Sequence, residues 1–182
     1  MKPWKRIEPT TVTKVGWRTI VSKTFIDNRG NQHVFDIIGR EGDETAHIIA
    51  LTPDKQVIIA RQYRTGPEKV MEELPGGMLS PGEEKTETAS RELLEETGYE
   101  AGHMEYMGYS YLSNYAHTIT HTFLATDCRL VREQELEHEE EVEVDTISIS
   151  QLLDNAKHGK MTDAVGVLLA YDQLMKLQEN VS

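Results

Sequence analysis

Alternating hydrophobic and polar residues in the first third of the chain predict two consecutive β-hairpins. Residues 17–40 hold two alternating runs separated by the polar, glycine-containing segment 27–31. Residues 45–64 hold two runs rich in Ile, Val and Ala, separated by the proline-containing segment 52–55. Clusters of Asn, Asp, Gly and Pro between such runs are typical of turns. We therefore expect each pair of runs to form two strands joined by a short turn.

The rest of the chain predicts further strands and helices. Alternation predicts strands at residues 103–112, 117–131 and 142–149. Helical spacing predicts helices at residues 85–97, 150–159 and 161–178. The last helix is expected to bury an apolar face made of Val165, Leu168, Leu169 and Tyr171. The order of strands, helix, strands and helices is typical of an α/β (α+β) fold, in which helices pack on a mixed sheet.

Size and composition are typical of a soluble globular protein. The chain has 182 residues, of which 38% are hydrophobic and 27% charged, enough to form one domain with a buried core. No segment contains 18 uninterrupted apolar residues, so no membrane span is expected. The basic N-terminal residues lack the apolar stretch of a secretory signal. Cys128 is the single cysteine, which excludes a disulfide framework, favours a cytoplasmic location and predicts a structural thiol.

The net charge of −12 limits the possible ligands. A general nucleic-acid binder needs a basic surface, so that class of function is not expected. The same charge would repel a phosphate-containing substrate, unless bound divalent cations invert the local field. Phosphate chemistry in this chain therefore depends on whether its acidic residues hold metal ions.

The strongest chemical signal lies in residues 76–100, which contain seven glutamates. Glycine and proline pairs within residues 76–82 predict a loop, and helical spacing starts at about Lys85. Gly98 is a typical residue just beyond a helix end, because glycine readily adopts the left-handed conformation. The acidic stretch is therefore expected to be a loop followed by one helix.

Three glutamates share one face of that helix. Glu92, Glu95 and Glu96 are spaced i, i+3 and i+4, whereas Ala89 and Leu93 lie on a different face, suited to packing on the sheet.

Stacked carboxylates repel one another, and Arg91, four positions before Glu95, is the one nearby cation that the spacing provides. Mg²⁺ or Mn²⁺ would relieve the repulsion, because these hard cations prefer oxygen ligands. Spacing alone leaves two interpretations open, a solvated acidic face and a metal site.

The stretch resembles the Nudix box, which reads Gly, five residues, Glu, seven residues, Arg-Glu-aliphatic, one residue, Glu-Glu, one residue, Gly-aliphatic. The matching positions are Gly77, Glu83, Arg91, Glu92, Leu93, Glu95, Glu96 and Gly98. Tyr99 departs from the pattern, because it is aromatic where an aliphatic residue is usual. The resemblance implies a Nudix α/β/α sandwich with a mixed sheet over residues 45–182, preceded by an antiparallel strand arm at residues 1–44.

The resemblance also implies roles for the box residues. Glu92 and Glu96 would be the main carboxylate ligands of Mg²⁺, with Mn²⁺ as an alternative metal. Glu95, held by Arg91, would be a further ligand or would orient the attacking water. The Gly76 carbonyl would be a backbone ligand.

Glu83 would brace the loop against the helix, and Gly77 and Gly98 would be structural positions of the box.

The segment ahead of the box resembles ADP-ribose and nucleoside-diphosphate-sugar pyrophosphatases. It contains Arg61-Gln62-Tyr63-Arg64 and then Glu73-Leu74-Pro75-Gly76-Gly77, with Gly76 in place of the usual alanine. That replacement is expected to spare a backbone contact. Arg64 and Arg61 are candidate ligands of the substrate phosphates, and the alternative for each is a surface arginine at a strand end. Glu73 would contact a ribose or a metal-bound water, or would brace the structure.

Two later segments bear on substrate and catalysis. The Pro-Gly pair usual downstream of the box in the ADP-ribose subset is absent, and Ser113-Asn114 stands in the comparable stretch. This departure leaves the substrate open. The acidic run at residues 133–145 resembles a family loop that carries a general base or late metal ligand. Glu140 is the first candidate and Glu139 and Glu141 are its rivals, while a solvated charge run is the alternative.

Other residues carry weaker signals. His117 and His121 are four apart, but they lie on a predicted loop and strand, so a zinc site is not expected. Trp4 or Trp17 could stack on an adenine, although such aromatic residues more often fill a core or interface. By resemblance, residues 1–44 would cross to a second subunit, which implies a homodimer.

These observations favour a metal-dependent hydrolase that cleaves ADP-ribose to AMP and ribose 5-phosphate. The expected partners are a small-molecule substrate and a second copy of the chain, with no nucleic acid and no membrane. Hydrolysis of another nucleotide sugar, a dinucleoside polyphosphate or FAD is the alternative within the enzyme class. A non-catalytic ADP-ribose sensor and an acidic interaction domain are the alternatives from other classes.

Overall fold

The computed structural model describes residues 1–136 and 141–179, and the chain divides into two units. The first unit consists of Met1–Glu44 and Tyr111–Ile119. The second consists of Thr45–Ser110 and the chain from Thr120 onward. The loop at residues 111–119, expected in the second domain, thus belongs to the first unit. The Ile38 backbone N–H donates to the Tyr115 carbonyl at 2.8 Å and joins this loop to the first unit.

Three antiparallel strands form most of the first unit, in the order β1-β2-β3. Their bounds are β1 (Lys5–Val15), β2 (Arg18–Ile26) and β3 (Gln32–Ile38). The predicted turn between β2 and β3 is confirmed, and the Asp27 carboxylate accepts backbone N–H groups from Arg29 at 2.8 Å and from Asn31 at 2.9 Å. The alternation does not predict β1, because its sequence is mainly polar, contains Pro9 and leaves most side chains exposed.

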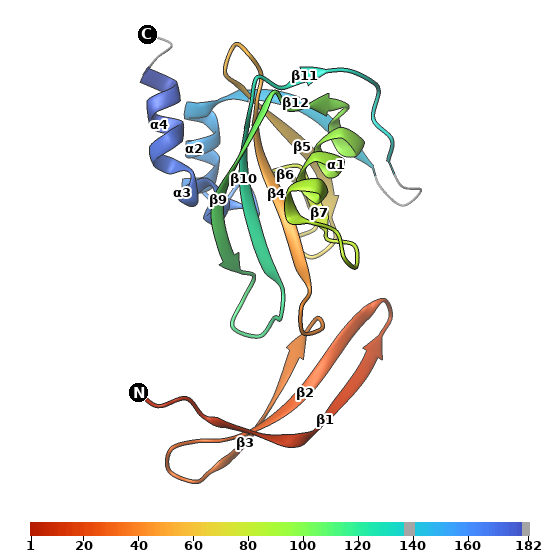
Figure 1. The fold of residues 1–182 in the computed structure, drawn as a ribbon, viewed down its shortest axis with the longest axis vertical. Coiled ribbons are helices and arrows are strands. Elements are labelled where there is room, and N and C mark those ends of the chain that lie inside the picture. Colours follow the sequence, from red (N-terminus) through yellow and green to blue (C-terminus); the bar gives the residue numbers. More distant parts are fainter. Residues whose placement is uncertain (137–140, 180–182) are drawn as a thin grey trace. The chain divides into compact units, whose positions relative to one another are not determined.

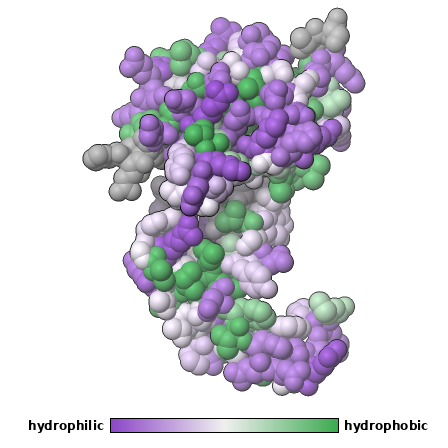
Figure 2. Space-filling model, turned by 180° about the vertical axis from the view of Figure 1, so that it is seen from behind, coloured by the Kyte–Doolittle hydropathy of each residue, from purple (hydrophilic) through white to green (hydrophobic). Residues whose placement is uncertain are grey.

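Hydrophobic side chains lie on the surface of the first unit, shown in green in Figure 2. Those exposed on its three strands and the turn between β1 and β2 are Val12, Val15, Trp17, Val34 and Ile38. Exposed apolar residues that form one patch are typical of surfaces that contact another protein.

A seven-stranded sheet forms the centre of the second unit (Figure 1), with the order β12-β5-β4-β10-β9, β6 paired with β5 and β7 paired with β4. The strands are β4 (Glu44–Leu51), β5 (Gln56–Arg64), β6 (Lys69–Glu73), β7 (Gly76–Met78), β9 (His103–Tyr111), β10 (Ile119–Thr126) and β12 (Val142–Ser148). The predicted hairpin of β4 and β5 is confirmed, closed by a hydrogen bond of 2.9 Å from Thr52 N to Gln56 O. Two short strands, β8 (Tyr99–Glu100) and β11 (Arg129–Leu130), pair beside the sheet.

Helices cover both faces of this sheet (Figure 1). One face packs on α1 (Lys85–Thr97) through a core that includes Ala89, Leu93 and Phe123. The other face packs on α2 (Ile149–Lys157), α3 (Ala164–Leu169) and α4 (Tyr171–Glu179). Alternation along the strands explains the two cores, because neighbouring residues such as Ile58 and Ile59 enter opposite clusters.

The predicted helix at residues 161–178 and its predicted apolar face are both wrong. The chain forms α3 and α4, separated at Ala170, and Val165 and Leu168 are exposed at 52% and 70%. The buried residues are Gly166, Val167, Ala170 and Leu174. Two of these four residues are small, and Gly166 packs closely, because a Cβ on it would lie 3.1 Å from Thr122 Oγ1. No helix in the described part of the chain is long and apolar enough to cross a membrane.

Candidate metal and substrate site

Helix α1 packs its apolar face on the sheet and directs Glu92 and Glu96 toward β7. Ala89 and Leu93 are fully buried under the helix. The helix ends at Gly98, which has a φ of 75° and whose N–H donates to Leu94 O at 2.9 Å. A Cβ at Gly98 would lie 2.1 Å from the Arg132 carbonyl oxygen, so this position also requires a close approach that only glycine allows.

Arg91 joins three carboxylates of the acidic stretch. Its Nε donates to Glu83 at 2.9 Å, and its Nη1 donates to Glu92 and to Glu95, each at 2.9 Å. Glu83 also accepts the Ser80 backbone N–H at 2.9 Å. The hydrogen bond from Arg91, followed by that from Ser80, lowers the pKa of Glu83 to about 2. The contacts of Glu83 therefore tie the loop to the helix.

The Gly76-Gly77 backbone lies against two of the glutamates. Gly76 N–H donates to Glu96 Oε2 at 2.8 Å. A Cβ placed on Gly77 would lie 2.3 Å from Glu92 Oε1, so the Glu92 carboxylate occupies the space that a side chain would need. Glu92 and Glu96 thus approach the same two-residue segment from adjacent turns of α1.

Gly76 has backbone neighbours where a side chain would lie. A Cβ at this position would lie 2.2 Å from the Ala46 carbonyl oxygen and 2.9 Å from the His47 Cα. The alanine that is usual here in the resembling pyrophosphatases would therefore force β4 and β7 apart. The expectation that glycine at this position spares a backbone contact to the metal stays a prediction.

Arg64 and Glu73 form a close pair beside this segment. Arg64 Nε lies 2.9 Å from both Glu73 carboxylate oxygens, and Arg64 Nη2 donates to the same carboxylate. Glu73 is 6% exposed, whereas the Arg64 side chain is 49% exposed. Hydrogen bonding to Glu73 raises the pKa of Arg64 against the opposing effect of burial, and the charges of Glu96 and Asp163 add to the increase. The guanidinium is thus anchored at one end and open to solvent.

Arg61 has other partners. It lies three positions before Arg64 on β5, so the two side chains leave opposite faces of the strand. Its Nη1 pairs with Asp145 at 2.7 Å and its Nη2 with Glu72 at 3.4 Å. The structure brings Arg64 together with Glu73, but it does not bring Arg61 into contact with them, and phosphate binding by Arg61 stays a prediction.

His47 and Asp163 are two residues that the sequence pattern does not single out. Asp163 Oδ1 lies 2.9 Å from His47 Nδ1, and Asp163 Oδ2 accepts the Leu74 backbone N–H at 2.9 Å. Burial alone would lower the pKa of His47, but the hydrogen bond and charge of Asp163, with Glu96 and Glu73, raise it. Burial would raise the pKa of Asp163, yet its bond to His47 and then Leu74 N–H hold it below its ordinary value.

The chain from Val131 to Leu136, here called the strap, lies against the C-terminal end of α1. Glu135 N donates to Glu95 O at 2.9 Å, and Gln134 Nε2 donates to Glu96 O at 2.5 Å and to Val142 O at 3.3 Å. These bonds satisfy carbonyl groups that a helix end leaves without helical partners. The strap leads into the acidic run, of which Glu139 and Glu140 lie outside the described residues. Glu141 is exposed just before β12.

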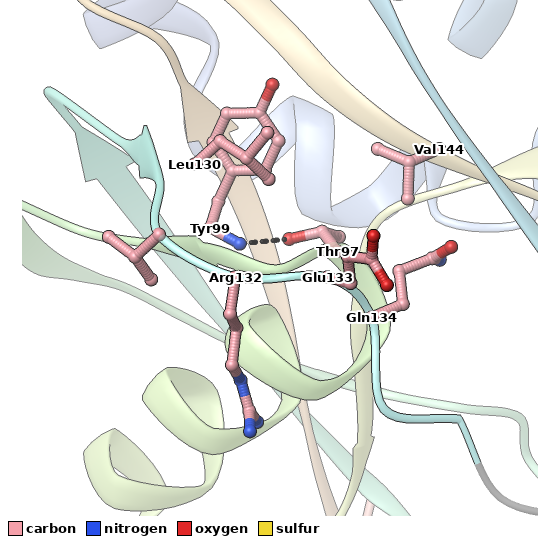
Figure 3. A pocket seen from close by; sticks show the side chains of 8 residues that line it. Thr97, Tyr99, Leu130, Arg132, Glu133, Gln134 and Val144 are labelled. Atoms are coloured by element: carbon pink, nitrogen blue, oxygen red, sulfur yellow. Dashed lines mark hydrogen bonds between the residues drawn. The ribbon is translucent and has the colours of Figure 1, made fainter.

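A hollow of about 780 Å³ lies beside the strap (Figure 3). Thr97, Tyr99, Val144 and strap residues line it, and Thr97 Oγ1 accepts the Tyr99 backbone N–H at 3.2 Å (Figure 3). The lining contains none of the box carboxylates, so we place the candidate site at Gly76-Gly77 and not in this hollow.

The weaker candidates have partners of their own. His121 is 7% exposed, and its Nδ1 lies 2.9 Å from the Tyr106 hydroxyl. Trp4 stacks on His33 at 4.9 Å between ring centroids, and the Arg18 guanidinium lies 4.9 Å from the Trp17 ring. Adenine stacking on either tryptophan stays a prediction.

The box residues fit a hard divalent cation by their chemistry. Glu92 and Glu96 bring carboxylate oxygens to the same glycine segment, and Glu95 follows on the same helix face. Within residues 1–136 and 141–179, no three His, Cys, Asp or Glu side chains are grouped as a ready metal site. Arg91 engages Glu92 and Glu95, so metal binding requires that these carboxylates exchange part of their contact with the guanidinium.

Comparisons with known proteins agree with this geometry. The NUDIX domain model matches residues 43–165. The ADP-ribose pyrophosphatase of Bacillus subtilis is 35% identical over 119 residues, covering 64% of this chain and 64% of that protein. The methanol dehydrogenase activator of Bacillus methanolicus is 31% identical over 134 residues, covering 72% of this chain and 71% of that protein.

A solved structure shares the fold. The crystal structure of an ADP compounds hydrolase superposes with a TM-score of 0.77 at 20% identity, covering 95% of this chain and 98% of that one. The predicted α/β (α+β) class and Nudix sandwich are thereby confirmed. Since the domain model spans more than half of the chain and carries the whole acidic helix, the chain belongs to the NUDIX family.

Proposed function

We propose that this chain is a metal-dependent hydrolase of nucleoside diphosphate-linked compounds, with ADP-ribose as the substrate. The observation that carries the proposal is the meeting of Glu92 and Glu96 at the Gly76-Gly77 backbone. The resemblance ahead of the box and the similarity to the B. subtilis ADP-ribose pyrophosphatase support ADP-ribose, which water would split into AMP and ribose 5-phosphate. This chain spans 64% of the length of that relative, so the substrate of the relative is carried over to this chain only as a proposal.

Glu92 and Glu96 would hold the cation, with Glu95 and the Gly76 carbonyl as further ligands. When bound, Mg²⁺ or Mn²⁺ would neutralise charge on the diphosphate and lower the pKa of the attacking water. Arg91 keeps two of the helix glutamates close together, because its guanidinium is shared by Glu92 and Glu95. Glu83 holds Arg91 in turn at 2.9 Å.

Arg64 would bind the substrate phosphates. Glu73 orients its guanidinium through two bonds of 2.9 Å from Nε, and the side chain is still half exposed. A guanidinium held in this way can place its remaining N–H groups against phosphate oxygens with little loss of entropy. The buried Glu73 would then act by holding Arg64, which is the bracing alternative and not the contact with a ribose or a metal-bound water.

Three further features belong to the proposal. A glutamate of the acidic run, Glu140 or one of its rivals, would accept the proton of the attacking water. The exposed apolar residues of the first unit support a homodimer formed through residues 1–44. The single cysteine, Cys128, supports a cytoplasmic location.

The test is phosphate release, in the presence of Mg²⁺ and added phosphatase, from ADP-ribose, ADP-glucose, GDP-mannose, NADH, FAD and diadenosine polyphosphates. We expect ADP-ribose to react fastest, and Glu96→Gln to reduce turnover by at least about 100-fold. Glu100→Gln makes the same chemical change outside the box and should retain activity, which makes it the matched control.

Turnover of a different compound would keep the metal site and change the substrate. No turnover of any compound, with Mg²⁺ bound, would contradict the hydrolase proposal and favour a sensor.

A further inference from the structure

Asp163 connects two segments that flank the glycine backbone of the metal site. Its carboxylate is 8% exposed and accepts a hydrogen bond from Leu74 N–H, two residues before Gly76. The other carboxylate oxygen lies 2.9 Å from His47 Nδ1 on β4. One side chain therefore holds both the end of β6 and the strand that pairs with β7.

The position of Asp163 just before α3 does not explain the hydrogen bonds of its carboxylate. Aspartate at a helix start normally accepts backbone N–H groups of the first turn. Asp163 makes no such side-chain bond, and both of its oxygens are directed to Leu74 and His47 instead. The neighbouring residue adds to the connection, since Thr162 Oγ1 donates to Glu73 Oε1 at 3.3 Å.

His47 passes this restraint to the metal site. It pairs with Gly76 in the register of β4 and β7, and Ile48 N donates to Pro75 O at 2.9 Å. The His47 ring packs closely on Gly76, because a Cβ at Gly76 would lie 2.8 Å from His47 Cδ2. A shift of the imidazole would therefore shift Gly76, whose N–H holds Glu96 Oε2 at 2.8 Å.

We propose that Asp163 and His47 form a clasp that holds the Gly76-Gly77 backbone in register with Glu96, and that both are positioning residues for the metal site. The inference rests on the proposed function, because it assigns the clasp to the site that Glu92 and Glu96 would form. The clasp acts through the backbone of Leu74 and Gly76, without requiring that either of its side chains contact the metal or the substrate.

The experiment measures Mn²⁺ binding without substrate, from the loss of the electron paramagnetic resonance signal of free Mn²⁺. His47→Leu removes the donor to Asp163 and keeps apolar bulk, and Asp163→Asn removes the charge. Each should weaken Mn²⁺ binding about 10-fold, the lower end of the effect typical of groups that orient metal ligands. His47→Asn can present an amide N–H where Nδ1 stood, and should restore affinity to within about twofold of wild type.

Controls separate this role from a loss of stability and from failure of the proposed function. Ser148→Ala removes the N-cap of α2, in which Ser148 accepts Gln151 N–H at 3.1 Å, and should lower stability without changing Mn²⁺ affinity. Wild-type affinity in His47→Leu and Asp163→Asn, with loss of binding in Glu96→Gln, would overturn the clasp alone. Equal weakening in His47→Asn and His47→Leu would also overturn it. Absence of Mn²⁺ binding in the wild type would overturn the clasp and the metal site together.

Discussion

Gly76 and Gly77 are adjacent in the site, but an added Cβ atom would meet different neighbours at each position. The space beside Gly77 is filled by the end of the Glu92 side chain, whereas the space beside Gly76 is filled by the backbone of Ala46. A side-chain end can rotate away at low cost, but a paired strand cannot. A substitution at Gly77 is therefore expected to affect metal binding, whereas a substitution at Gly76 is expected to affect stability.

Gly77→Ala is expected to weaken Mn²⁺ binding about 10-fold with little change in the free energy of unfolding, because it displaces the Glu92 carboxylate. Gly76→Ala is expected to lower the free energy of unfolding by about 1–3 kcal/mol, because it separates β7 from β4. Urea denaturation and Mn²⁺ titration of both variants check this. Identical behaviour of the two variants would contradict the assignment of different neighbours.

Cys128 is expected to be chemically silent in the folded protein. It is 1% exposed, and burial raises the pKa of its thiol to about 11. Only about one thiol in a thousand would then be ionised at pH 8. A thiol-reactive disulfide reagent at pH 8 should react slowly with the native protein and at once after denaturation in guanidinium. Complete reaction of the native protein within a minute would contradict this structural role.

At the scale of elements, the sequence predicts the features that depend on residues close together in the chain. The acidic helix follows from the spacing of Glu92, Glu95 and Glu96 and from Gly98, and the contact of Arg91 with Glu95 follows from their separation by four positions. The split between α3 and α4 does not follow, because periodicity counts large apolar residues whereas Gly166 and Ala170 face the core.

The opposite directions of Arg61 and Arg64 could have been derived from strand alternation. The family motif by itself treats both arginines alike. The contact between Asp163 and Leu74 had no such signal, because it joins residues 89 positions apart through a loop.

Glu41 is the centre of an ion-pair cluster on the three-stranded element at the N-terminus. Glu41 pairs with Lys23 at 2.5 Å and with Arg6 at 2.6 Å, and Lys23 is only 7% exposed. Hydrogen bonds from Lys23 and then from Arg6 lower the pKa of Glu41 to about 2. Because the folded state lowers this pKa, the stabilisation is present above the ordinary value of 4.5 and is lost as pH falls through about 2.

Glu41→Gln is therefore expected to destabilise the first unit at neutral pH, where it leaves the Lys23 ammonium without its carboxylate partner. The difference in urea midpoint between wild type and variant should be constant near pH 7 and shrink between pH 4.5 and about 2. Trp4 and Trp17 are the two tryptophans of the chain and both lie in this unit, so their fluorescence reports its unfolding. A midpoint difference that does not change with pH would contradict the pairing.

At the scale of the molecule, the division into two units suggests separate tasks. The second unit contains all the described residues proposed to hold metal and phosphate, and the first unit exposes Val12, Val15 and Trp17. Exposed apolar residues favour association, because a partner chain can remove their surface from water. The first unit would then serve assembly.

Sedimentation equilibrium is expected to give twice the chain mass of 20.7 kDa. Trp17→Glu places a charge on the proposed interface and should shift the mass toward that of the monomer. Lys176→Glu, at an exposed position of α4 in the second unit, is the charge-changing control and should remain dimeric. A monomeric wild type would contradict assembly through residues 1–44.

The long separation between Leu74 and Asp163 also determines when the site can exist during protein synthesis. The two residues are 89 positions apart, and α1 with its glutamates lies between them. A ribosome therefore releases the carboxylates of the site well before it releases the aspartate that holds the glycine backbone in place. Through the clasp, the nascent chain is expected to reach its full metal affinity only after Asp163 has left the ribosome, so metal bound at that affinity is not expected to guide the folding of the strands made before α1.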